Sequence, residues 1–134
     1  EAEKIYKEKG IDEYHQNERE HANEPLELGP VGGLLKKISN IQKLERKLVL
    51  GDNNYKPKLR TSIVTARNAP AHERVITTLK EWGIEVDEAF FMGGIEKKKV
   101  LDIMKPHIFF DDQETHLKGL TNVPSVHIPF GVTN

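Results

Sequence analysis

The strongest constraint on the fold is the alternation of short β-branched or aromatic runs with helical runs in residues 59–134. The runs with strand character lie at residues 62–64, 86–91, 107–110 and 125–128. Helical patterns at 70–82 and 96–104 separate the first three of them. Alternation of this kind is typical of a parallel sheet with crossover helices. Residues 59–134 are therefore predicted to form an α/β core.

Residues 1–58 have a different sequence pattern, which is helical and polar. A highly charged helix is predicted over 1–20, and the Asn, Pro and Gly residues of 23–30 end it. A second helix is predicted over 31–48. Its apolar stripe consists of Leu34, Leu35, Ile38, Ile41 and Leu44. We therefore expect a small, mostly helical unit over 1–58.

Composition excludes several classes of function. The chain has no cysteine, which excludes disulfides, thiolate catalysis and zinc–thiolate sites. With 20 basic and 21 acidic residues the net charge is −1, so no nucleic-acid partner is expected. No apolar run approaches the roughly 18 residues of a membrane span, and the charged opening EAEKIYKEKG is unlike a secretory leader. A cytoplasmic location without a membrane partner is the expectation.

Polar side chains follow three of the predicted strands. Thr65 follows the first, Lys97 follows the second after a Gly-Gly loop, and Asp111-Asp112 follow the third. Ligands of open parallel sheets bind at the carboxyl ends of the strands. A hydroxyl, an ammonium and two carboxylates at one edge suit a phosphoryl site, in which the carboxylates hold Mg²⁺.

Each of these residues has a second interpretation. Thr65 could cap the next helix. Lys97 belongs to a run of three lysines, which is typical of a solvated helix face. The adjacent carboxylates of Asp111 and Asp112 repel each other behind an apolar strand unless a cation or donors compensate, which favours a ligand role.

Other signals for a site are weak. The six histidines show no ligand spacing, and surface or packing roles are expected for His72, His107 and His116. Trp82, at the end of an amphipathic helical pattern, is expected in the core. Neither a P-loop nor a Gly-x-Gly-x-x-Gly fingerprint is present.

Three segments together resemble a known family. HANEPLELGPVGGLL, VTARNAPAHERVITTLKEWGIEVDEAFFMGG and KPHIFFDDQ are similar to the bacterial relatives of cytosolic 5′-nucleotidase I, in the haloacid dehalogenase superfamily. The resemblance extends from about Glu1 to Gly131. It implies a Rossmann-like three-layer sandwich with a parallel sheet, and a small helical cap over 1–58 that contributes to nucleotide selection.

The resemblance also implies roles for individual residues. Thr65 corresponds to the hydroxyl that binds the transferring phosphoryl group, and Lys97 to the lysine that balances its charge. Asp111 and Asp112 correspond to the Mg²⁺-binding motif. The residues that line the substrate pocket would be Ala66, Arg67 and Asn68. Where the family has Pro-Lys-Gly, this chain has Glu96-Lys97-Lys98.

One departure from the family concerns the nucleophile. The superfamily places Asp-x-Asp at the end of its first strand, just before a segment resembling EAEKIYKE, and nothing here matches that motif. Loss of a covalent nucleophile costs on the order of 10⁶ in turnover. The implied strand order is fifth, fourth, first, second, third, so the missing strand is the central one. We expect the Thr65 and Asp111 strands to pair directly or to accept a strand from a missing N-terminal segment or a second copy.

Three functions remain after these arguments. The first is a Mg²⁺-dependent 5′-nucleotidase that hydrolyses nucleoside 5′-monophosphates through an aspartyl-phosphate in the full-length protein, with this chain inactive alone. The second is a non-catalytic module that binds nucleotides, anions or a partner. The third is a phosphoacceptor receiver domain, which ranks low because its acidic pair should precede the lysine.

Overall fold

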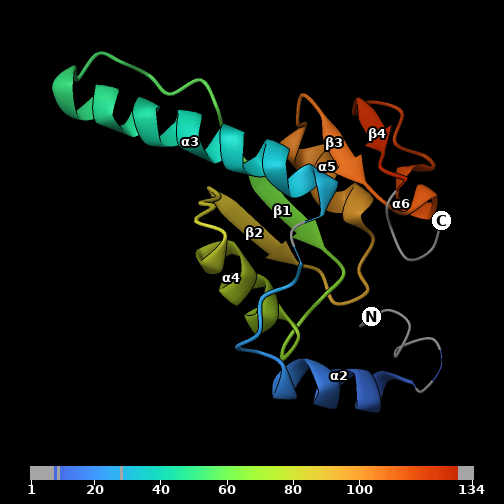
Figure 1. Ribbon diagram of the computed structural model, residues 1–134. Coiled ribbons are helices and arrows are strands. Elements are labelled where there is room, and N and C mark those ends of the chain that lie inside the picture. The colour runs from blue at the N-terminus through green and yellow to red at the C-terminus, as the bar shows by residue number, and fades with distance from the viewer. Residues whose placement is uncertain (1–7, 9, 28, 130–134) are drawn as a thin grey trace.

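The computed structural model describes residues 8, 10–27 and 29–129 (Figure 1). Its elements, in chain order, are α2 (Ile11–Glu20), α3 (Pro30–Gly51), β1 (Ser62–Thr65), α4 (His72–Glu81), β2 (Glu88–Phe91), α5 (Lys97–Met104), β3 (Phe109–Asp111), α6 (Glu114–Leu117) and β4 (Ser125–His127). The chain therefore has the predicted α/β character. None of the helices in the described part is long and apolar enough to cross a bilayer.

The four strands form two separate parallel pairs. β1 pairs with β2 from Ser62 opposite Glu88 to Thr65 opposite Phe91. β3 pairs with β4, with Phe110 opposite Val126. Within the described residues β1 and β3 have no other strand partner, so the expected direct pairing of the Thr65 and Asp111 strands is wrong. β1 and β3 therefore each have one edge that forms no strand pairing within the described residues.

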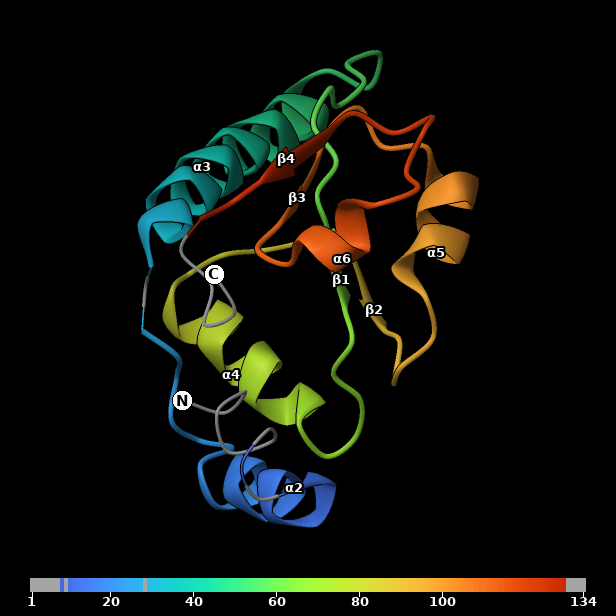
Figure 2. The same ribbon diagram turned by 90° about the vertical axis from the view of Figure 1, so that its right-hand side faces the viewer.

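Helices cover the strands from two sides. In Figures 1 and 2, α3 and α4 lie on one side of the strands and α5 lies on the other. α2 lies beyond α4, at the bottom of both views. This layering agrees with a Rossmann-like arrangement. The division into a cap over 1–58 and a core over 59–134 stays a prediction.

The ends of the helices follow the expected stop signals. α4 ends just before Gly83, whose φ of 65° is the left-handed conformation that glycine adopts readily. α5 ends at Met104, and the next residue, Lys105, is also left-handed and directly precedes Pro106. The predicted helix over 1–20 is observed as α2 from Ile11, and residues 1–7 and 9 lie outside the described residues. The four-residue helix α6 was not predicted.

The buried side of α3 is polar. Its buried residues are Gly32, Ser39, Gln42 and Glu45. Glu45 accepts hydrogen bonds from the backbone N–H groups of Lys58 (2.7 Å) and Leu59 (3.1 Å), and the Lys58 N–H is the main cause that holds the pKa of this carboxyl below its ordinary value. Gln42 donates to Asp87, which also accepts from the N–H of Thr61 at 2.7 Å. Side chains of α3 thus satisfy backbone donors just before β1.

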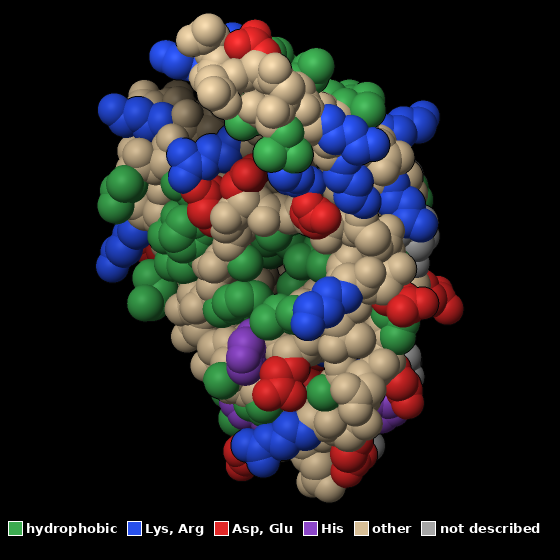
Figure 3. All heavy atoms as spheres, turned by 90° about the vertical axis from the view of Figure 1, so that its left-hand side faces the viewer, with side chains coloured by type: hydrophobic (Ala, Val, Ile, Leu, Met, Phe, Trp, Pro, Cys, Tyr) green, Lys and Arg blue, Asp and Glu red, His purple; other side chains and the backbone are tan. Residues whose placement is uncertain are grey.

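The apolar stripe of α3 is largely exposed. The stripe residues exposed to solvent are Leu34, Ile41 and Leu44, and Leu48 and Leu50 follow them further along the chain. Figure 3 shows hydrophobic side chains around a hollow in the middle of one face, with lysine and arginine side chains gathered above it. A stripe with this spacing normally faces a core, and here the polar contacts to the segments before β1 and β2 turn the other side of α3 inward. Trp82, expected in the core, is only partly buried.

Leu101 is the largest fully buried hydrophobic side chain of the described residues, at 1% exposure. Leu101→Ala on α5 should lower the free energy of unfolding by about 2–4 kcal/mol, because it removes buried methyl groups and leaves a cavity. Ile103→Ala is the matched control, since Ile103 lies on the same helix at 83% exposure and should change stability by less than about 0.5 kcal/mol. Urea unfolding of both variants measures the difference, and equal losses would contradict the assigned core.

Candidate functional site

The ends of three strands meet at one cleft of about 670 Å³. Thr65 at the end of β1, Gly93-Gly94 after β2, Lys97 at the start of α5 and Asp112 after β3 all line it. Parallel strands bring their carboxyl ends to the same edge. The structure therefore brings together the residues that sequence reasoning placed at a shared edge.

Thr65 faces the cleft from the last position of β1. Its carbonyl accepts the Met92 N–H at 2.8 Å, which ties the strand end to β2. Its hydroxyl oxygen accepts the backbone N–H of Arg67 at 3.2 Å. α4 begins only at His72 after Ala71, so the alternative that Thr65 caps this helix is wrong.

A single lysine of the three-lysine run reaches the strand ends. The Lys97 ammonium lies 2.6 Å from Oδ2 of Asp111, and the two side chains are 11% and 2% exposed. Lys98 instead pairs with Asp102 on the surface, where both side chains are more than 40% exposed. The solvated-face interpretation therefore fails for Lys97 and fits Lys98. The match of Lys97 to the lysine in the family's Pro-Lys-Gly stays a prediction, and the contact with Asp111 supports it.

The Asp111 carboxylate is buried within a ring of donors. Lys97 approaches Oδ2, the Gln113 N–H donates to Oδ1 at 2.9 Å, and Nδ1 of His116 lies 3.1 Å from both oxygens. Burial pushes the pKa of Asp111 upward, but the Lys97 ammonium, the Gln113 N–H and His116 together outweigh it and hold the pKa below its ordinary value. Asp111 is therefore a carboxylate at neutral pH.

The carboxylates differ in their availability to a cation. Both oxygens of Asp111 are engaged by donors, whereas Asp112 is only partly buried and lines the cleft. Mg²⁺ accepts one or two protein carboxylates and completes its octahedron with water and phosphate oxygens. Asp112 fits such a ligand directly, and Asp111 fits it after exchanging a donor contact. Within the described residues, no group of three or more His, Asp or Glu side chains is arranged around a metal position.

The predicted substrate-binding residues lie in the loop after β1. Ala66, Arg67 and Asn68 all line the cleft. Asn68 packs against Gly93 so closely that a Cβ on this glycine would lie 3.2 Å from two Asn68 atoms. Gly93 also has a φ of 58°, so only glycine fits both the conformation and the contact without strain. The Gly-Gly loop after β2 thereby supports the position of Asn68.

Sequence reasoning missed three residues that line the cleft. His116 was expected to have a packing or surface role, yet it contacts Asp111 and lines the cleft. Its position five residues after Asp111 was the available signal. Tyr14 and His15 of α2 form another wall, although their helix is distant in sequence. The packing role expected of His72 is observed, with its ring set edge-on to Phe91.

A second cavity, of about 410 Å³, extends between the two strand pairs. Val64 and Thr65 of β1 line one side of it, and Phe110 and Asp111 of β3 line the other. The start of α3, including Leu35, closes it. The edges of β1 and β3 that carry no ladder therefore border the same space.

The ion pair of Lys97 gives a prediction for stability against pH. The folded pKa of Asp111 lies below its unfolded value near 4, so the ionised carboxylate stabilises the fold above that pH and the contribution is lost as pH falls through the folded pKa. Asp111→Asn should lower the free energy of unfolding by roughly 3 kcal/mol at pH 7 and by less at pH 3. Urea unfolding at both pH values measures this. Asp102→Asn, at the surface pair, should cost less than about 1 kcal/mol, and an Asp111 effect independent of pH would contradict the assignment.

Comparison with known proteins identifies the family of the chain. The family model described as 5′-nucleotidase matches residues 1–134. Cytosolic 5′-nucleotidase 1B of Homo sapiens is 37% identical over 127 residues, which cover 94% of this chain and 20% of that protein. The chain thus spans about a fifth of the length of this relative. No solved structure matches this chain. The chain belongs to the 5′-nucleotidase family.

Proposed function

We propose that this chain forms the phosphate- and cation-binding part of a Mg²⁺-dependent 5′-nucleotidase that hydrolyses nucleoside 5′-monophosphates to nucleoside and phosphate. The observation that carries the proposal is the meeting of Thr65, the Lys97–Asp111 pair and Asp112 at one cleft. Family membership and the name of the human relative support the choice of nucleotide as the phosphate ester. That relative is named as cytosolic, and we propose a cytoplasmic location here as well.

Each side chain has a distinct task in this proposal. The Thr65 hydroxyl donates to a phosphoryl oxygen, and the Lys97 ammonium neutralises negative charge that develops on the phosphoryl group. Asp112 holds Mg²⁺ with help from Asp111, and the bound ion would offset phosphate charge. Arg67 and Asn68, with Ala66 between Thr65 and Arg67, form the adjoining wall for the rest of the nucleotide. His116 keeps the Asp111 carboxylate oriented toward Lys97.

The covalent step requires an aspartate from outside this sequence. In the mechanism implied by the resemblance to haloacid dehalogenases, a carboxylate oxygen bonds to phosphorus while the bond to the nucleoside 5′-oxygen breaks, and a second acid gives that oxygen its proton. Water then attacks the phosphorus of the aspartyl-phosphate, which releases phosphate and restores the carboxylate.

The cavity between β1 and β3 suits the strand that would carry this aspartate. Paired strands lie about 4.8 Å apart, so a strand inserted between two others holds them at twice that spacing and satisfies both free edges. The cavity is bordered by Thr65 and Asp111, so a residue at the end of such a strand would enter the phosphate site. A strand from a second copy is the other source, and the measured mass of the active species separates the two.

A longer polypeptide that adds an upstream Asp-x-Asp segment should release phosphate from AMP in the presence of Mg²⁺, whereas the 134-residue chain should release it about 10⁶-fold more slowly. EDTA should abolish the activity, and Asp112→Asn should raise the Mg²⁺ concentration needed for half-maximal rate. A colorimetric phosphate assay measures each rate. Inactivity of both polypeptides would favour the non-catalytic binding module, and full activity in EDTA would contradict the metal site.

The lysine run offers a matched pair of variants in the same active polypeptide. Lys97→Met should lower kcat about 10²- to 10³-fold, because it removes the cation nearest the phosphate site. Lys99→Met removes the same charge from an exposed position two residues away and should leave kcat within about twofold. Equal kcat values for the two variants would show that Lys97 does not act on the phosphoryl group.

A further inference from the structure

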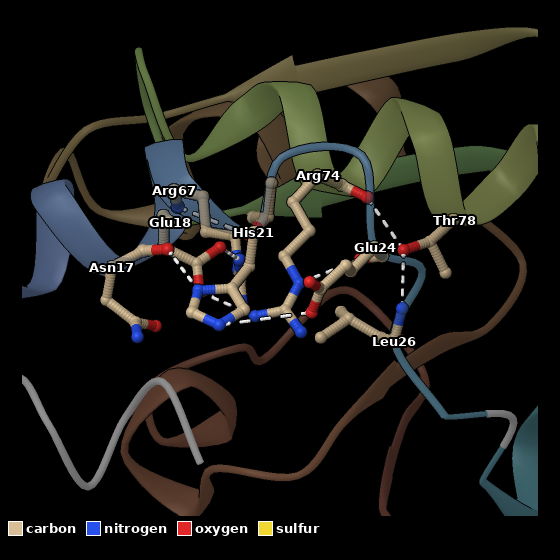
Figure 4. Close-up of polar contacts among 9 residues, drawn as sticks. Asn17, Glu18, His21, Glu24, Leu26, Arg67, Arg74 and Thr78 are labelled. Atoms are coloured by element: carbon tan, nitrogen blue, oxygen red, sulfur yellow. Dashed lines mark hydrogen bonds and ion pairs between the residues drawn. The ribbon is translucent and has the colours of Figure 1, made fainter.

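The attachment of α2 to the rest of the molecule depends on a buried charge. Glu18 is fully buried and is the single buried residue of this helix. Its carboxylate contacts the guanidinium of Arg67 through one oxygen and that of Arg74, at 3.2 Å, through the other. Figure 4 shows the three side chains pointing toward one another. A carboxylate without solvent is stable only with such partners, so the contact fixes α2 in position.

The segment that follows α2 is tied to α4 at the same place. Nε of Arg74 donates to the carbonyl of Glu24 at 3.0 Å, and the hydroxyl oxygen of Thr78 accepts the N–H of Leu26 at 2.9 Å. The same Thr78 hydroxyl donates to the Arg74 carbonyl at 2.7 Å, as Figure 4 shows. Helix α2 and its exit are therefore both held by residues of α4.

The helical repeat places three further side chains of α2 on the Glu18 face. Ile11, Tyr14 and His15 precede Glu18 by seven, four and three residues, which is the spacing of one helix face. All three line the 670 Å³ cleft that also contains Thr65 and Lys97. The centroids of the Tyr14 and His15 rings lie 5.6 Å apart. The cleft thus has a charged end at the strand termini and an aromatic wall on α2.

We propose that this face of α2 binds the nucleobase of the substrate, with Tyr14 and His15 as its stacking surface and Glu18 as the residue that positions it. The inference rests on the proposed nucleotidase function and adds the subsite for the base. Arg67 links the two ends, because it lines the cleft and is held by Glu18. Aromatic rings stack on a base by its π-face, which fits a wall with little hydrogen-bonding selectivity.

Calorimetric titration of the chain with AMP and with ribose 5-phosphate, both with Mg²⁺, tests the proposal. The ratio of the two dissociation constants reports the contribution of the base alone. Tyr14→Ala should weaken AMP binding about 5- to 100-fold and leave ribose 5-phosphate binding unchanged, and Tyr14→Phe should keep the wild-type ratio. Gln16→Ala, on the exposed side of the same helix, is the control that should change neither constant.

Glu18→Gln tests positioning and should also reduce the ratio, because α2 loses its anchor. Glu20→Gln makes the same chemical change at an exposed position and should have no effect. If Glu18 only neutralised charge, its variant would tighten the binding of both ligands equally and leave the ratio unchanged, which would overturn its positioning role.

A ratio of the two dissociation constants near one in the wild-type chain, or equal weakening of both ligands in Tyr14→Ala, would overturn the stacking surface on α2 while leaving the phosphate site intact. Absence of binding by either ligand would overturn the phosphate site and the wall together.

Discussion

The Lys97–Asp111 ion pair is the contact on which the arrangement of the site depends. Lys97 follows the β1–β2 pair through α5, and Asp111 ends β3 of the other pair. β1 and β3 are not hydrogen-bonded to each other, so this buried ion pair directly connects the β1–β2 pair to the β3–β4 pair. It also places the ammonium at the point where the strand ends meet. The two charges that support the structure are therefore the same two that the proposed phosphate chemistry uses.

Buried polar contacts have an unusually large part in holding this chain together. Among the described residues, the buried polar or charged side chains outnumber the buried hydrophobic ones. Glu18 holds α2, Glu45 holds α3 to the segment before β1, and Asp111 holds α5. Such contacts are directional, so they fix where an element lies more sharply than apolar packing does. The exposed apolar residues of α3 show that part of the hydrophobic surface of this helix is not buried against the other described residues.

The sequence predicted the strand-end residues well and their surroundings poorly. Thr65 and Asp112 were predictable because the carboxyl ends of parallel strands share an edge, whatever the detailed packing. The choice of Lys97 over Lys98 depends on which side of α5 faces β3, and a short polar helix gives little sign of that in its sequence. The position of Tyr14 in the wall of the cleft depends on the placement of α2. Arg67, which contacts Glu18 from 49 residues further along the chain, helps to determine that placement. No local pattern carries such information.

The separation of the strands into two pairs also could not be predicted from local sequence patterns. The strand pattern at 62–64 and 107–110 predicted parallel strands correctly, but strand neighbours are set by whatever segment fills the space between them. The polar inward face of α3 was equally hidden, because its hydrogen bonds are made to backbone groups whose positions the sequence does not reveal. Element type was therefore predictable, whereas neighbours and burial were decided by long-range contacts.

The most direct measurement is a crystal structure of the chain grown with Mg²⁺ and inorganic phosphate. We expect a phosphate within hydrogen-bond distance of the Thr65 hydroxyl and the Lys97 ammonium, with the cation bound to Asp112. Phosphate and cation bound elsewhere, with the cleft at the three strand ends filled only by water, would contradict it.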